Sequence, residues 1–412
     1  MTFERTLYVG IESTVGEPIV PVGVLKLLRR GVIEAGEFAY GQRYLQLPDA
    51  EALNPDHLPL RATSFALAEK RIRDGGALPL TFRDALPDSW GRKVLESQYG
   101  NDLTDIDALL LTNADRVGAM VFAEQLPIQV ETPSVELIKL DALADAVYRL
   151  EFSLDISPLM KRLLQRGGTL GGARPKATFI HDATRWLAKF PAKGDAYDVE
   201  ILEAATLTLA QQCGIEVSPF FVQAIHRGHA LLLHRFDRLG TLENERRLHF
   251  LSAAALLDVP YESSEGSYVA LAQTLRAISA DPTHDLQQLY RRMLFNLMID
   301  NSDDHVKNHG VLLTSHKGYR LSPAFDLVPQ LNNIGYQQLA ILPGRFESHL
   351  ALAREAAPHF GISAVNAETM INALSVQISQ YFSSILSAQK AHKILIDRVQ
   401  TCLIKQAKLI RQ

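Results

Sequence analysis

Short extended runs broken by turns mark the first part of the chain, before helical segments take over. Such spacing predicts a small antiparallel sheet. The predicted strands are Leu7–Ile11, Ile19–Val24, Tyr44–Leu47 and Val117–Phe122, and the predicted helices are Arg92–Gln98 and Ile106–Leu111. Residues 1–125 are therefore expected to form a mixed α/β domain.

Two further regions follow. An acidic, proline-bearing connection, Glu124–Ser134, precedes a predicted helix, Ser134–Arg149. Residues 134–238 are expected to form one region, and 239–412 a mainly helical one. The elements predicted in them are strands at 177–180, 186–190, 310–313 and 319–321, helices at 203–213 and 286–298, and long helices from about Ala364 to the end.

The last helix carries two kinds of side chain. Apolar residues predict a side that faces the core, namely Ile394, Leu395, Val399, Leu403 and Ile404. Basic residues predict a solvated face, with contact to DNA phosphates as the alternative, namely Lys390, Lys393, Arg398, Lys405, Lys408 and Arg411.

Composition narrows the class of protein. The 412 residues are 47% hydrophobic, enough for two or three domains that each bury a core. The formal net charge of -4 is small and indicates neither a nucleic acid nor a membrane as a partner. Cys213 and Cys402 alone give no disulfide framework, and no run of about 18 apolar residues predicts a spanning helix. We expect a cytoplasmic protein.

Two adjoining loops hold the clearest candidate chemistry. Asp303 stands five positions before Asn308, the offset at which a protein kinase places its proton-accepting carboxylate and a magnesium-binding amide. Asp326 follows Asn308 by eighteen residues, where a kinase has its main metal ligand. Oxygen-bearing side chains of this kind suit a hard cation and a triphosphate.

Upstream residues fit the same chemistry. The glycine-rich stretch 167–176 could bring backbone N–H groups close to phosphates, although such stretches are often only turns. Lys189 on a predicted strand precedes Glu203 on a predicted helix, which is the order of the kinase ion pair. Glu200 could take the place of Glu203.

Two other interpretations of the downstream cluster are weaker. His305 and His309 are four residues apart and could bind zinc on one helix, but the sequence around Asn308 is turn-like. Asp and Asn also favour turns and helix ends without any chemical role. The combination of Asp303, Asn308 and Asp326 with a nearby lysine favours phosphoryl transfer.

Joint motifs across nearly the whole chain resemble the HipA family of serine/threonine toxin kinases. They are F-R-D-A-L-P-D-S-W-G-R (82–92), T-L-G-G-A-R-P-K-A (169–177), W-L-A-K-F-P (186–191), H-R-F-D-R (234–238), N-x-x-x-x-N-S-D-D-H-x-K-N (296–308) and L-S-P-A-F-D-L-V-P (321–329). The resemblance implies an α+β, protein-kinase-like fold with two lobes behind the N-terminal domain.

Residue roles follow from that resemblance. Asp303 would be the catalytic base, with Lys189 contacting phosphates and Glu203 holding Lys189. Asn308 and Asp326 would bind Mg²⁺. The residues implied to bind ATP are Gly171, Gly172, Ala173, Arg174, Pro175, Lys176, Lys189, His234, Arg235, Phe236, His305, Lys307, Asn308, Phe325 and Asp326, with His234–Phe236 as the hinge.

The chain departs from the family pattern at two positions. Thr169 stands where relatives carry an autophosphorylated serine, so Thr169 is the candidate for self-inactivating modification. Asp304 beside Asp303 leaves open which carboxylate is the base, because a second carboxylate raises the proton affinity of one of them.

The family also implies partners. A HipB-like helix-turn-helix antitoxin would neutralise the kinase and contact operator DNA, and a protein such as an aminoacyl-tRNA synthetase would be phosphorylated, with persistence as a consequence of arrested growth. Two alternatives remain: a small-molecule or lipid phosphotransferase with the same ATP site, and a catalytically silent corepressor.

Overall fold

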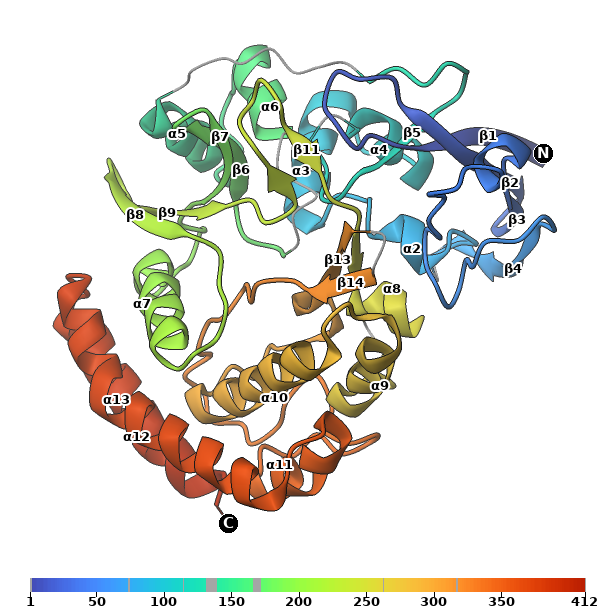
Figure 1. The fold of residues 1–412 in the computed structure, drawn as a ribbon. Coiled ribbons are helices and arrows are strands. Elements are labelled where there is room, and N and C mark those ends of the chain that lie inside the picture. Colours follow the sequence, from blue (N-terminus) through green and yellow to red (C-terminus); the bar gives the residue numbers. More distant parts are fainter. Residues whose placement is uncertain are drawn as a thin grey trace.

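The computed structural model describes residues 2–72, 75–113, 115–130, 139–165, 172–261, 263–315 and 318–411. Figure 1 shows an N-terminal sheet (blue), a second sheet (green) beside it, and a helical lobe (yellow to red) below both. The order of helices and strands is α+β, as expected. Within the described part of the chain, no helix combines the length and apolar character that a bilayer crossing needs.

The N-terminal sheet has five antiparallel strands in the order β4-β3-β2-β1-β5. They are β1 (Thr2–Ile11), β2 (Val20–Arg30), β3 (Ile33–Tyr40), β4 (Phe65–Arg71) and β5 (Met120–Ala123), accompanied by helices α1 (Gln42–Leu45), α2 (Leu80–Arg83), α3 (Ser89–Tyr99) and α4 (Asp105–Leu111). Phe38, Phe82 and Phe122 meet edge to face in its core, at centroid distances of 5.2 and 5.8 Å. The predicted antiparallel sheet is thus confirmed.

The strand predicted at Tyr44–Leu47 is wrong. Residues 42–45 form α1, and the buried ring of Tyr44 stacks on Tyr40 with its hydroxyl donating to the carbonyl of Glu51 at 2.8 Å. These contacts within the domain override the strand preference of a short apolar run.

The second sheet has the order β6-β7-β9-β8, with β6 (Lys176–His181), β7 (Thr184–Lys189), β8 (Phe220–Ile225) and β9 (Gly228–His234). Ala188 and Leu232 face α5 (Leu140–Glu151) and α6 (Pro158–Gln165), whereas Leu231 and Leu233 face α7 (Val199–Gln212) and the helical lobe. This alternation is the two-residue period of strands. Helix α3 packs into the same core through Trp90. The helix predicted from Ser134 begins at Leu140, because Lys139 before it is extended; residues 131–138 lie outside the described ranges.

The helical lobe is built around the buried helix α10 (Pro282–Ile299), which Asp281 caps and Pro282 starts. Its other elements are β12 (Phe250–Ser252), α8 (Ala253–Leu257), α9 (Tyr268–Ile278), η2 (Val306–Asn308), β13 (Gly310–Ser315), β14 (Gly318–Leu321), α11 (Leu350–Ala356), η3 (Ala357–Phe360), α12 (Ala364–Ala388) and α13 (Lys393–Leu409). The predictions of strands at 310–313 and 319–321 and of the helix at 286–298 are confirmed.

The predicted core side of α13 is partly wrong. Leu395 and Val399 are buried, but Ile394 is 72% exposed and Ile404 is 62% exposed. Helices α12 and α13 run along the outer edge of the lobe (Figure 1), so each has only one face to bury.

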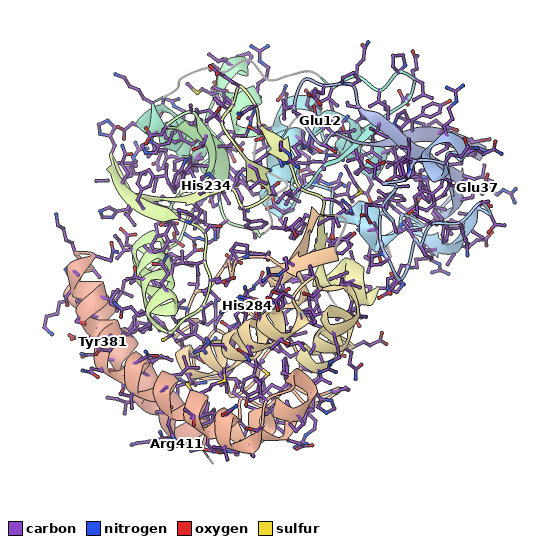
Figure 2. All side chains as sticks on the ribbon, viewed as in Figure 1. Glu12, Glu37, His234, His284, Tyr381 and Arg411 are labelled. Carbon is purple, nitrogen blue, oxygen red and sulfur yellow. The ribbon has the colours of Figure 1, made fainter. Side chains whose placement is uncertain are left out.

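A buried charge network joins the N-terminal domain to the segment that follows β9, where β10 (Arg238–Leu239) and β11 (Arg246–Arg247) pair in a separate two-stranded sheet. Asp237 contacts Arg235 at 2.7 Å and Arg238 at 2.6 Å, and it accepts from the backbone N–H of Gly118 at 2.9 Å. Arg247 contacts Glu12, which Figure 2 labels where the two parts meet.

Removing the charge of Asp237 should therefore destabilise the fold. Asp237→Asn leaves two buried guanidinium groups without their shared carboxylate, and we expect the free energy of unfolding to fall by about 3–5 kcal/mol. Urea unfolding measures the change. Asp145→Asn is the control, because the ion pairs that Asp145 forms with described residues, Arg149 and Arg227, are exposed. This substitution should cost below about 1 kcal/mol. Equal midpoints for the two variants would contradict the expectation.

Candidate active site

The site begins at the end of β7, where Lys189 is buried between two carboxylates. Its Nζ lies 2.7 Å from Glu203 Oε1 and 2.8 Å from Asp326 Oδ1. Burial opposes the charge of Lys189, but the two carboxylates outweigh burial and raise the pKa above its ordinary value. Lys189 is therefore held as a cation.

Helix α7 separates the two glutamates that the sequence left as alternatives. Glu203 contacts Lys189, whereas Glu200, about one turn earlier, contacts Arg174 at 2.8 Å. Asp198 caps the start of the helix by accepting from the N–H of Ile201 at 3.0 Å. The geometry places Glu203, not Glu200, against the lysine.

Asp326 follows Phe325 in a loop beyond β14, and its φ of 58° lies in the left-handed region that Asp tolerates better than most residues. Burial favours the neutral acid, but Lys189, with smaller contributions from Lys176 and His305, lowers the pKa of Asp326 to about 2. The carboxylate is ionised at neutral pH.

The loop between α10 and β13 turns through η2 and presents Asp303 and Asn308 together. Asp303 is exposed, and its backbone carbonyl accepts from the Asn308 amide at 3.4 Å. Because the amide nitrogen donates to the loop, the amide oxygen of the buried Asn308 is the atom left for a cation.

Asp304 has a different environment from Asp303. It is buried, accepts a hydrogen bond from the Tyr268 hydroxyl, and contacts His309 Nε2 at 2.9 Å. The Asp304 carboxylate therefore stabilises the loop through these two contacts. Of the two neighbouring aspartates, Asp303 is the one that is exposed to solvent.

The pH dependence of activity should report Asp303. Asp303 is exposed as a residue, but its surroundings remove part of the hydration of its carboxyl group. This loss of hydration, with repulsion from Asp326 and Asp304, raises the pKa of Asp303, although His305 opposes the shift. A base with a raised pKa loses its charged form at a higher pH, so we expect the acid limb of kcat/KM to lie above the ordinary aspartate value of about 3.9. His305→Gln should move that limb further upward. A limb at or below the ordinary value would argue against Asp303 as the base.

The glycine-rich stretch is described only from Gly172 onward; Thr169 and Gly171 lie outside the described residues. A Cβ added to Gly172 would lie 3.6 Å from Lys176 Nζ and 4.0 Å from Asp326 Oδ2, so this backbone reaches the site. Ala173 and Pro175 continue the stretch, and the carbonyl of Pro175 accepts from the N–H of Phe190 at 2.9 Å.

Arg174 is engaged by two acidic side chains. Its guanidinium forms two 2.8 Å hydrogen bonds with Asp195 and a third with Glu200. Any role in binding ATP stays a prediction for this side chain.

The predicted hinge lies at the end of β9. The N–H of His234 donates to Pro219 at 2.8 Å, and the buried side chain of Arg235 points into the charge network. Phe236 stacks on Phe325, with ring centroids 5.4 Å apart. The structure thus brings a residue of the predicted hinge and a residue of the Asp326 loop together.

The residues present fit a nucleotide with a hard cation. Ionised Asp326 and the Asn308 oxygen are ligands of the type that Mg²⁺ prefers, while Lys189 offers positive charge to a phosphate. Zinc fits less well. Within the described ranges no three His, Cys, Asp or Glu side chains are grouped to hold a metal, and His305 Nδ1 accepts from the N–H of Lys307 at 3.2 Å.

Family models match both parts of the chain. The HipA N-terminal domain matches residues 19–123, and the HipA-like C-terminal domain matches residues 168–382, more than half of the chain. The chain belongs to the HipA family. The recognition of toxin-kinase motifs in the sequence is thereby confirmed.

Individual relatives agree with this HipA assignment. The "Putative kinase Y4mE" of Sinorhizobium fredii is 26% identical over 74% of this chain and 73% of its own length. The "Putative kinase Y4dM" of the same organism is 25% identical over 50% of this chain and 52% of its own length. The HipA chain of a Shewanella oneidensis complex with HipB and operator DNA has a TM-score of 0.71 at 17% identity, covering 98% of this chain and 96% of that chain. The HipA fold is therefore shown.

Two residues that lie beside the candidate site were not singled out from the sequence. Asp88 and Trp90 both contact Lys176. The carboxylate Oδ2 of Asp88 lies 2.6 Å from Lys176 Nζ, and the indole Nε1 of Trp90 donates to the Lys176 carbonyl at 2.8 Å. Both residues belong to the motif at 82–92. That motif indicated the family, but it did not indicate that these two side chains lie against Lys176.

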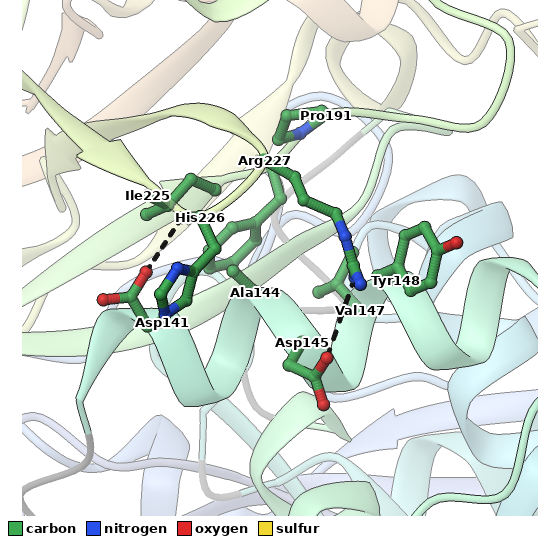
Figure 3. A pocket seen from close by; sticks show the side chains of 10 residues that line it. Asp141, Ala144, Asp145, Val147, Tyr148, Pro191, Ile225, His226 and Arg227 are labelled. Atoms are coloured by element: carbon green, nitrogen blue, oxygen red, sulfur yellow. Dashed lines mark hydrogen bonds and ion pairs between the residues drawn. The ribbon is translucent and has the colours of Figure 1, made fainter.

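A hollow of about 150 Å³ lies between α5 and the turn that joins β8 to β9 (Figure 3). Arg227 crosses it toward Asp145, while His226 lies over Asp141. It is smaller than the roughly 300 Å³ of ordinary ligand pockets. None of the predicted site residues that the structure describes lines this hollow.

Proposed function

We propose that this HipA-family protein is an ATP- and magnesium-dependent serine/threonine protein kinase. The observation that carries the proposal is the convergence on Lys189, whose Nζ joins Glu203 of α7 and Asp326 of the loop after β14 within 2.8 Å. In sequence these groups are up to 137 residues apart. Their meeting at one buried ammonium matches the arrangement that positions nucleotide phosphates in kinases.

Each residue has a distinct part in this proposal. Asp303 orients the acceptor hydroxyl and takes its proton. Lys189 orients the phosphates, and Glu203 fixes the lysine. Asn308 and Asp326 would hold Mg²⁺, which supplies neutralisation of phosphate charge when bound. Electrostatics and positioning provide most of the rate acceleration.

We further propose that the chain is the toxin of a HipA/HipB-like pair. Support comes from the full-length fold likeness to a HipA that was solved with HipB and operator DNA. The partner would be a helix-turn-helix antitoxin, contact with operator DNA would pass through that antitoxin, and the substrate would be a cellular protein such as an aminoacyl-tRNA synthetase. Thr169 would accept a self-inactivating phosphate.

Labelling of cell extract tests the proposal. When the purified protein is added to cell extract with radiolabelled ATP and Mg²⁺, it should transfer label to a serine or threonine of another protein. The Lys189→Met variant should transfer none. Label on a metabolite or lipid would favour the small-molecule phosphotransferase, and antitoxin binding without any transfer would favour the silent corepressor.

A further inference from the structure

A segment of the N-terminal domain, residues 84–90, crosses to the proposed ATP site and is anchored at both ends. Asp84 accepts from the N–H and the hydroxyl of Ser252, at 2.7 and 2.6 Å, where β12 meets α8. Trp90, 2% exposed, donates its indole N–H to the carbonyl of Lys176 at the start of β6. We call residues 84–90 the crossing segment.

Asp88, within the crossing segment, makes two contacts with two different oxygens. Oδ1 accepts from the N–H of Gly91 at 2.7 Å and caps α3, and Oδ2 lies 2.6 Å from Lys176 Nζ. The two carboxylate oxygens therefore join a helix of the N-terminal region to a lysine of the second sheet.

Lys176 links Asp88 to the glycine-rich stretch. Its side chain is 1% exposed, and its Nζ also donates to the carbonyl of Gly172 at 2.7 Å. An ammonium group has three donors, so these contacts leave one that can serve a phosphate oxygen. Asp326 is close by, since both Lys176 Nζ and Asp326 Oδ2 lie within 4.0 Å of a Cβ added to Gly172.

The charge of Lys176 depends on Asp88. Burial lowers the pKa of Lys176, and Asp88 provides the largest opposing effect. Without that carboxylate the lysine would lose both an anchor and most of the support for its positive charge.

We infer that Asp88 is a positioning residue for the nucleotide. Acting through Lys176, it holds the Gly172 end of the glycine-rich loop against the phosphate position, so the N-terminal domain contributes directly to ATP affinity. This inference rests on the proposed kinase function.

ATP binding by the full chain tests the inference. Asp88→Asn keeps an oxygen that can cap α3 but removes the charge that faces Lys176. We expect the Kd for ATP with Mg²⁺, measured by calorimetry, to rise about 10-fold, in line with the loss of one charged hydrogen bond. The Kd for adenosine should stay unchanged, because adenosine lacks the phosphates that the loop would hold.

Two comparisons separate positioning from general loosening of the fold. Asp105→Asn is a matched control, because Asp105 pairs with Arg83 and Arg92 of the same region and makes no contact with the loop in the described residues. It should leave both affinities unchanged. In a double-mutant cycle with Lys176→Met, Asp88→Asn should add little once Lys176 is gone.

The outcomes are distinguishable. Unchanged ATP affinity in Asp88→Asn, an equal loss for ATP and adenosine, or additive effects with Lys176→Met would each overturn the inference while leaving kinase function intact. Failure of the unmodified protein to bind ATP would instead overturn the proposed function and this inference with it.

Discussion

Asp303→Asn is expected to lower the rate of phosphoryl transfer about 100- to 10,000-fold, the usual effect of losing a general base. The amide keeps the size of the side chain but cannot accept the proton of the acceptor hydroxyl. Because Asp303 is exposed and makes no contact with Lys189 in the described residues, ATP affinity and the unfolding midpoint should both be retained. Initial rates of label transfer, together with ATP binding, measure the effect.

The neighbouring aspartate is the matched control for this experiment. Asp304→Asn disturbs the buried contacts with Tyr268 and His309, so it should lower the unfolding midpoint as well as activity. If Asp303→Asn kept normal turnover while a folded Asp304→Asn lost it, the assignment of the base would be reversed.

Asp326→Asn should lower turnover about 100- to 1,000-fold, on the scale of removing one preorganised electrostatic group. It should also raise the Mg²⁺ concentration needed for half-maximal rate. Two causes combine, since the variant removes an ionised ligand and one of the two carboxylates that hold Lys189. Magnesium titrations of the initial rate at saturating ATP measure both changes.

Asp182→Asn is the control for replacing an aspartate at a position of positive φ, such as position 326. Asp182 also has a positive φ, 47°, but its side chain is 89% exposed. The substitution should leave rate and magnesium dependence unaltered. An unshifted magnesium titration for Asp326→Asn would count against its role as a cation ligand.

Much of the architecture was readable from local pattern. The apolar spacing of α7 and α10 predicted helices, and the runs that became β6, β7, β13 and β14 predicted strands, because burial of a periodic face is a local property of the chain. The exposure of Ile394 and Ile404 was not predictable in this way, since it depends on how few neighbours the outer helix α13 has.

The order of candidate residues along the chain was equally informative. Lys189, Glu203, Asp303, Asn308 and Asp326 occur in kinase order, the last three at kinase spacing, and this pattern together with the shared motifs already indicated the family. Order carries this information because each residue lies on, or directly beside, a regular element whose place in the chain is set by local pattern: Lys189 on β7, Glu203 on α7, and the other three in the turns that follow α10 and β14.

Side-chain partners depended on contacts between distant parts of the chain. The identity of the glutamate on Lys189, the burial of Asp304 rather than Asp303, and the reach of Asp88 from the N-terminal domain to Lys176 all arise from such contacts. A linear pattern places a residue on an element, but which groups meet, and how much solvent they lose, is set only when the elements pack together.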